Sequence, residues 1–192
     1  MNLKNIINNS LNEARKTLDI FLSNPENLEK IEAAANLMSG AIANGKKIIS
    51  CGNGGSLCDA THFAEELTAR FRLDRRAFPA VAVNDPAFIT CASNDFSPDT
   101  VFSRYVEALG NEGDVLLAIS TSGNSANVIE AAKAAISKGI KVVALTGKNG
   151  GELSKICSIE IRAPMSKFSD RVQEIHIKVI HILVECIEAS LL

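Results

Sequence analysis

The chain has 192 residues, enough for one domain with a full hydrophobic core but with little room for a second. Its formal net charge of −2, single tyrosine and lack of tryptophan argue against direct binding to nucleic acid, which needs a basic and aromatic surface. Five scattered cysteines without a C-x-x-C pair predict reduced core thiols in a cytoplasmic protein, and the absence of a signal peptide or a membrane-length apolar run predicts no membrane insertion.

Two amphipathic helices are expected before the first strand. Apolar residues recur at helical spacing over residues 3–22, and a second helix runs from Asn24-Pro25-Glu26 to a stop at Asn44-Gly45. The first helix stands outside the later alternation of strands and helices. Its apolar stripe must therefore pack either on its own domain or on a neighbouring subunit. We expect residues 1–44 to belong to one domain that spans residues 1–192.

From residue 47 onward, short apolar runs alternate with helical patterns. Strands are predicted at 47–51, 78–84, 115–119, 141–146 and 158–162, and helices at 56–72, 89–94, 100–109, 128–138, 151–156 and 170–192. This alternation predicts an α/β fold in which helices cover both faces of a five-stranded parallel sheet. Ligands of such sheets bind beyond the carboxyl ends of the strands, so the turns after the first three strands should share one edge.

The turn after the third strand is the strongest predicted ligand site. It has no acidic residue, contains the conformationally free Gly123, and holds four hydroxyl residues: Ser120, Thr121, Ser122 and Ser125. Unpaired backbone N–H groups and the positive end of the helix dipole attract anions to such a turn. A simple serine N-cap needs only one hydroxyl. Four hydroxyls therefore predict binding of a phosphate or phosphosugar.

The glycine-rich turn after the first strand, Gly52-Asn53-Gly54-Gly55-Ser56, does not match a nucleotide motif. The third glycine of the dinucleotide fingerprint would fall on Leu57. A separate segment, Gly40 to Lys47, nearly has P-loop spacing, but Lys47 stands where that motif needs serine or threonine, and the segment precedes a strand instead of following one. Two alternatives remain open for this turn. Its backbone either approaches a small polar ligand or forms a tight structural turn.

All three histidines lie on two predicted helices. His62 and Glu66 are four residues apart and project from one helix face, where they could hold a divalent metal or share a proton. Gln173 and His181, eight apart on the last helix, also face one way, while His176 points elsewhere. The alternatives are a solvated helix face and a satisfied core histidine. The concentration of histidines on two helices nevertheless suggests one shared site.

Three further polar residues fall at expected ends of elements. Asn94 and Asp95 follow the connection from the second strand, and Asp170 precedes the final helix. Each could bind sugar hydroxyls. Each could equally be a helix cap, which is the default interpretation for Asp170.

Seven motifs, in order and over nearly the whole chain, resemble the phosphoheptose isomerase family of the sugar-isomerase-domain superfamily. They are C-G-N-G-G-S, H-F-A-E-E-L-T-A-R-F, A-S-N-D-F, F-S-R-Y-V-E-A-L-G, G-D-V-L-L-A-I-S-T-S-G-N-S-A-N-V, L-T-G-K-N-G-G and R-V-Q-E-I-H-I-K-V-I-H-I-L. The resemblance implies a three-layer α/β/α sandwich with a long C-terminal helix, a homotetramer and one zinc ion per subunit. It also implies conversion of sedoheptulose 7-phosphate to D-glycero-D-manno-heptose 7-phosphate, the first step of heptose biosynthesis for lipopolysaccharide or other surface glycans.

The resemblance also implies roles for individual residues. The phosphate loop matches Ser120, Thr121, Ser122 and Ser125, and further substrate contacts match Asn53, Gly54, Gly55, Ser56, Asn94 and Asp95. The metal ligands match His62, Glu66, Gln173 and His181, of which Glu66 and Gln173 also match substrate contacts. Glu66 and His181 resemble the catalytic base and acid, and Asp170 matches a carboxylate near the site.

Three other functions are alternatives to this one. Non-enzymatic relatives that bind the bacterial replication initiator lack the helix glutamate and the second histidine, whereas Glu66 and His181 are both present here. Regulators that sense phosphosugars carry an N-terminal DNA-binding unit, but residues 1–44 are neither basic nor helix-turn-helix in pattern. An isomerase for another phosphosugar stays open, because pocket length cannot be derived from the sequence.

Overall fold

The computed structural model describes residues 2–192, so only Met1 of the predicted domain lies outside the described residues. The elements in chain order are α1 (Leu3–Leu22), α2 (Glu26–Ala43), β1 (Ile48–Gly52), α3 (Gly55–Thr68), β2 (Ala80–Ala82), α4 (Pro86–Asp95), η1 (Pro98–Thr100), α5 (Val101–Leu109), β3 (Val115–Ser120), α6 (Ala126–Ser137), β4 (Lys141–Thr146), α7 (Leu153–Ile156), β5 (Ile159–Arg162) and α8 (Ser169–Leu191).

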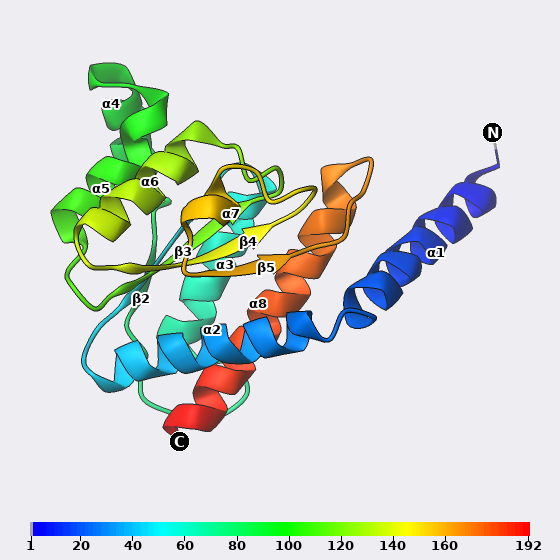
Figure 1. Cartoon of the computed structure of the whole chain (residues 1–192), viewed down its shortest axis with the longest axis horizontal. Helices are drawn as coiled ribbons and strands as arrows, with labels where there is room; N and C mark the ends of the chain where they lie inside the picture. The colour runs from blue at the N-terminus through cyan, green and yellow to red at the C-terminus, as the bar shows by residue number, and fades with distance from the viewer. Residues whose placement is uncertain (1) are drawn as a thin grey trace.

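The strands form one parallel sheet in the order β2-β1-β3-β4-β5, as the sequence predicts. Gly52 of β1 is in register with Ile119 of β3, and Ser120 of β3 is in register with Thr146 of β4. The carboxyl ends of these three strands therefore reach the same edge of the sheet (Figure 1). The loops that follow them begin side by side.

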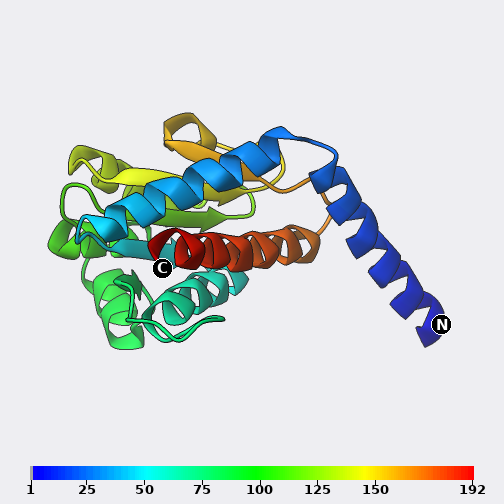
Figure 2. The same cartoon turned by 90° about the horizontal axis from the view of Figure 1, so that it is seen from below.

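Alternate residues of the strands enter two separate cores. In β3, Leu117 and Ile119 pack with α2, α3 and α8, whereas Leu116 and Ala118 pack with α5 and α6. All six residues of β3 are buried, which is why its sequence is continuously apolar instead of alternating. Figure 2 shows α2, α8 and α3 lying along one face of the sheet. The predicted three-layer α/β/α sandwich with a long C-terminal helix is confirmed.

Three predicted boundaries are wrong, each for a local reason. Helix α3 ends at Thr68 instead of residue 72, because its last carbonyls accept hydrogen bonds from the loop that follows. Strand β2 covers only Ala80–Ala82 and is partly exposed, because it is an edge strand that pairs with β1 alone. Helix α4 begins earlier than predicted, at Pro86, because the Asp85 side chain caps it by accepting from the Phe88 N–H.

The two N-terminal helices pack very differently. Helix α2 lies against α8 and buries Ile31, Ala34 and Met38. Helix α1 buries only Thr17 and Phe21 near its C-terminal end, and the rest projects from the body of the molecule (Figures 1 and 2). The apolar side chains of its first half are exposed: Leu3, Ile6, Ile7 and Leu11.

All five cysteines are free, as predicted. The prediction that they lie mainly in the core is wrong for Cys58 and Cys91, which are exposed, whereas Cys51 is buried. Cysteine spacing in the sequence does not reveal which helix face reaches solvent. Among residues 2–192, no helix combines the length and apolar character that a membrane crossing would need.

Candidate functional site

Three side chains converge at the surface between α3 and α8, two helices that are far apart in the sequence but packed against each other. His62 Nε2 lies 3.2 Å from Glu66 Oε1 on the same helix and 3.0 Å from His181 Nε2 on α8. Ligand atoms of all three residues lie within 4.8 Å of one another. The i, i+4 spacing on α3 places His62 and Glu66 one above the other, and only the packing of α3 on α8 brings His181 to them.

These three residues are a suitable donor set for a divalent metal. Two imidazole nitrogens and a carboxylate oxygen are common zinc ligands, with bonds of about 2.0–2.2 Å. Ligand atoms arranged tetrahedrally at such a radius lie roughly 3.3 Å apart, close to the 3.0 and 3.2 Å separations around His62 Nε2. A fourth position would remain for another ligand. The residues present therefore fit a zinc ion.

Gln173, the predicted fourth ligand, is in the first turns of α8, and its side chain lies against the start of α3. Its side-chain amide packs against Gly55, where an added Cβ would come within 2.5 Å of Gln173 Nε2. Gly55 thus lets the amide approach the backbone of the glycine-rich turn. His181 is eight residues, or about 12 Å of helix, further along α8. The structure therefore brings His62, Glu66 and His181 together and gives Gln173 a contact with the substrate-loop candidate Gly55.

The glycine-rich turn and the hydroxyl turn meet at the edge of the sheet. The amide groups of Asn53 and Asn127 exchange two hydrogen bonds of 2.8 and 2.9 Å, which join the turn after β1 to the first turn of α6. Asn127 is not among the residues predicted from the sequence. Its only signal was a polar side chain in the first turn of the helix that follows the hydroxyl residues.

The hydroxyl turn has the features expected of an anion site. Ser120 Oγ and Ser125 Oγ lie 2.9 Å apart, and Ser125 is the N-cap of α6 but makes no side-chain capping bond. No acidic residue lies in the first turn of α6. Gly123 has φ +67° and packs on the next loop so closely that a Cβ would lie 1.9 Å from the Gly150 carbonyl oxygen. Ser122 differs from the other serines, because its hydroxyl accepts a hydrogen bond from Asn124 N–H.

The remaining predicted polar residues do not join the three-residue cluster. Asn94 Nδ2 donates to Asp95 Oδ1 at 3.0 Å at the end of α4, and the described part of the chain gives neither a bond to the cluster. Asp170 lies in the first turn of α8 and accepts from Arg171 N–H at 2.8 Å, so it is not the N-cap, which is Phe168.

His176 does not belong to a site shared by all three histidines. It is buried, and its Nε2 pairs with the Thr146 carbonyl oxygen at 2.8 Å, on the side of α8 that faces the sheet. Burial lowers the pKa of His176 to about 4, so the ring is neutral. The two helices therefore share a cluster through His62 and His181 only, and His176 is a core histidine whose Nδ1 has no hydrogen-bond partner among the described residues.

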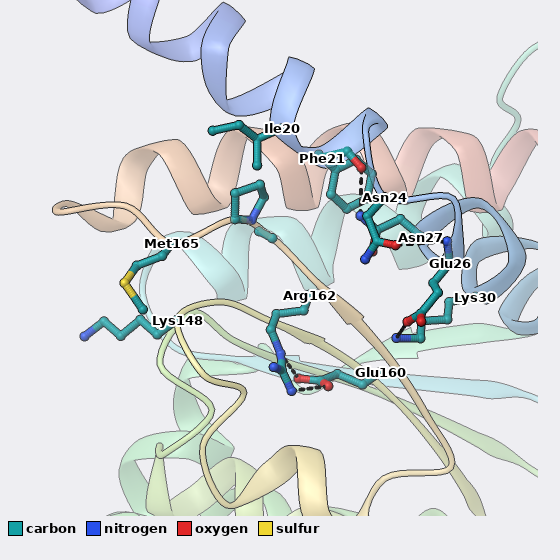
Figure 3. Close-up of a pocket in the computed structure, with 12 residues that line it drawn as sticks. Ile20, Phe21, Asn24, Glu26, Asn27, Lys30, Lys148, Glu160, Arg162 and Met165 are labelled. Atoms are coloured by element: carbon teal, nitrogen blue, oxygen red, sulfur yellow. Dashed lines mark hydrogen bonds and ion pairs between the residues drawn. The ribbon is translucent and has the colours of Figure 1, made fainter.

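A shallow surface hollow of about 520 Å³ lies beside the cluster and is lined by His62, Thr61 and Asn84, among others. Another polar hollow, of about 310 Å³, lies at the α1–α2 junction and is lined by Lys148, Arg162 and Met165 (Figure 3). Arg162 there is paired with Glu160, and none of the predicted site residues lines this hollow. We therefore place the candidate site at the converging side chains and not at this hollow.

Comparison with known proteins shows to which family the chain belongs. A sequence profile of the SIS domain family matches residues 11–147. Phosphoheptose isomerase of Pectobacterium atrosepticum is 55% identical over 188 residues, which cover 98% of this chain and 97% of the relative. This chain belongs to the phosphoheptose isomerase family. The phosphoheptose isomerase of Salmonella dublin is 56% identical over the same length.

Solved structures lead to the same family. The phosphoheptose isomerase of Neisseria gonorrhoeae superposes with a TM-score of 0.91 at 39% identity, over 98% of this chain and 100% of that one. Because both chains are covered end to end, the similarity includes α3, α8 and the loops at the sheet edge. These phosphoheptose isomerases lend no support to the replication-initiator alternative.

Proposed function

We propose that the chain interconverts sedoheptulose 7-phosphate and D-glycero-D-manno-heptose 7-phosphate through an enediolate. The observation that carries this proposal is the convergence of Glu66 and His181, from helices far apart in the sequence, within 4.8 Å of each other and of His62. A carboxylate and an imidazole at that separation can serve one proton-transfer reaction. Membership of the phosphoheptose isomerase family supplies the substrate class.

The reaction needs two proton relays. Glu66 takes a proton from C1 of the ketose and returns it to C2, which converts the ketose to the aldose through the enediolate. His181 carries a proton from the C1 hydroxyl to the C2 oxygen as the carbonyl changes place. Negative charge builds on these oxygens, so donors placed beside them lower the barrier. An imidazole can both accept and donate a proton, which suits His181 to this exchange.

Zinc, held by His62, Glu66 and His181 with Gln173 as a further candidate, would polarise the two reacting oxygens. Glu66 is then both a candidate ligand and the candidate base. A carboxylate that binds a metal is a weaker base, so comparison of the metal-free and zinc-loaded protein bears on both roles.

Substrate binding is assigned to the edge of the sheet. The hydroxyls of Ser120, Thr121, Ser122 and Ser125 would hold the phosphate, supported by the close pair formed by Ser120 and Ser125. Asn53, Gly54, Gly55, Ser56, Asn94, Asp95 and Asp170 are proposed for the sugar hydroxyls. Binding energy from the distant phosphate would orient C1 and C2 for proton transfer.

A homotetramer and a cytoplasmic location complete the proposal. The exposed apolar half of α1 needs a partner surface, and a second copy of the chain supplies one. Five cysteines, all free, suit the reducing cytoplasm. The product would feed heptose biosynthesis for a surface glycan.

The test is turnover of sedoheptulose 7-phosphate by the wild type, Glu66→Gln and His181→Gln, each assayed after chelation and after zinc is restored. Loss of a general base or acid should lower turnover by about 10²- to 10⁴-fold. Glu65→Gln is the matched control, because Glu65 is the neighbouring exposed carboxylate on α3. In D₂O, deuterium should enter at C2 of the aldose. A folded, zinc-replete wild type that leaves the ketose unchanged would overturn the proposal.

A further inference from the structure

The loop between α3 and β2 places a phenyl ring on His181. The ring centroids of Phe71 and His181 lie 5.7 Å apart with 29° between the planes, a stacked arrangement. The His62 ring is the other neighbour, at 5.1 Å and 58°. Phe71 has no polar side-chain atom, so it contributes neither a proton nor a metal ligand. Its contribution is contact with one face of the imidazole.

A buried carboxylate fastens this loop to the helix that carries His181. Glu188, which is 2% exposed, accepts hydrogen bonds from the backbone N–H groups of Phe71 and Arg72 at 3.4 and 3.3 Å. Glu188 lies seven residues, about two turns, after His181 on α8. The backbone of Phe71 is thus bonded to the same helix as the ring on which it stacks.

A buried guanidinium fastens the loop to the other helix of the site. Arg75 Nε donates to Glu188 Oε1 at 2.7 Å, and Arg75 Nη2 and Nη1 donate to the carbonyl oxygens of Glu66 and Leu67 at 2.9 and 3.0 Å. These carbonyls lie in the last turn of α3, where no helical N–H is available to them. One guanidinium therefore joins the end of α3, next to the proposed base, to α8.

We propose that Phe71 is a positioning residue, which holds the His181 imidazole at the angle that points Nε2 toward His62 and Glu66. Rotation about the Cβ–Cγ bond of histidine is broad and weakly restricted, so packing decides the ring angle. A stacked aromatic neighbour restricts that angle without forming a hydrogen bond. The Arg75–Glu188 pair holds Phe71 beside the His181 ring, because it bonds the loop to both helices. The catalytic part of this inference rests on the proposed function, whereas the ring orientation does not.

Kinetics of Phe71→Leu and Phe71→Tyr give the first test. Phe71→Leu keeps an apolar side chain but removes the flat ring. Misplacement of a reacting group can lower the reaction rate by up to about 10²-fold. We expect kcat to fall roughly 10- to 100-fold with KM nearly unchanged. Phe71→Tyr, which keeps the ring, should recover kcat to near the wild-type value. Leu73→Ala, in the same loop and 53% exposed, is the matched control.

NMR of the His181 ring tests the geometry without turnover. Phe71→Leu should shift the His181 ring 1H and 15N signals by removing the neighbouring ring current and loosening the ring, whereas Leu73→Ala should not. Wild-type kcat in Phe71→Leu, or a Tyr variant as impaired as the Leu variant, would overturn the inference. If the wild type itself fails to isomerise the ketose, the proposed function fails. Unchanged His181 signals in Phe71→Leu would then refute the positioning role by themselves.

Discussion

At the scale of single residues, Asp59 carries a carboxylate whose ionised form is disfavoured by burial. It lies one turn before His62 on α3, and its Oδ2 is buried with no hydrogen-bond partner among the described residues. Burial raises the pKa of the Asp59 carboxyl to about 6, and the charge of His62 offsets part of that rise. The sequence carries no signal for this burial, because a single acidic residue on a helix is usually solvated.

Asp59→Asn should stabilise the fold at neutral pH. A folded-state pKa above the unfolded value means that the ionised carboxyl destabilises the fold above about pH 6, and that this cost disappears as pH falls toward the unfolded pKa of 3.8. The carboxyl is partly exposed, so the gain at pH 7.5 should be only about 1 kcal/mol. Urea unfolding of the chelated protein at pH 7.5 and 4 measures it. An equal gain at both pH values would contradict this account.

At the scale of elements, α8 contacts α3 with one set of side chains and the end of β4 with another. His181 and Gln173 lie toward α3, whereas His176 lies against the end of β4 and pairs with the Thr146 carbonyl oxygen. The eight-residue spacing of Gln173 and His181 predicts a common direction, and the position of His176 between them predicts another. Which of these directions meets the core depends on how α8 sits on the sheet, and periodicity does not contain that information.

The buried neutral His176 should make stability fall in mild acid. Its pKa is lowered to about 4, against an unfolded value near 6.5, so the unfolded chain binds a proton at a pH where the fold does not. Stability from this residue is complete above about pH 6.5 and declines as pH falls toward 4, by up to roughly 3 kcal/mol. Denaturant unfolding between pH 7 and 4.5 should show a steeper decline for the wild type than for His176→Gln. Parallel pH profiles of unfolding free energy for the wild type and His176→Gln would contradict this prediction.

At the scale of the whole molecule, the first half of α1 is not buried by its own chain. Leu3 is 71% and Leu11 66% exposed on a helix that projects from the body. Arg171 Nη2 donates to Ser10 Oγ at 2.8 Å, so the helix is anchored to α8 at mid-length. The sequence left two places for the apolar stripe. The fold buries only the last turns of α1 on its own domain, and we propose that the first half packs on a neighbouring subunit.

Leu11→Glu should weaken the proposed tetramer without unfolding the chain. The charge would enter a protein–protein contact, while in the isolated chain the Leu11 side chain lies mostly in solvent. Light scattering after size exclusion should give four times the 20.5 kDa chain mass for the wild type and a lower mass for the variant. Asn9→Glu adds the same charge to the same exposed helix as a control. A variant of wild-type mass would place the interface elsewhere.

The order and type of the main elements, the parallel sheet and the two loops at its edge follow from the sequence alone. Those features depend on neighbouring residues: apolar runs such as Val115–Ile119 are buried on both faces, and hydroxyl-rich or glycine-rich turns follow them. The i, i+4 pair of His62 and Glu66 was also visible, because helical spacing alone sets it.

Contacts between side chains far apart in the sequence depend on the tertiary structure. Packing of α3 on α8 brings His181 to His62 and excludes His176, and the loop after α3 brings Phe71 to His181. The early end of α3 depends on Arg75, a residue nine positions after Glu66 whose partner Glu188 lies at the far end of the chain. Contacts at such separations are set by the packing of whole elements, because local periodicity fixes a direction on a helix but not what lies opposite it.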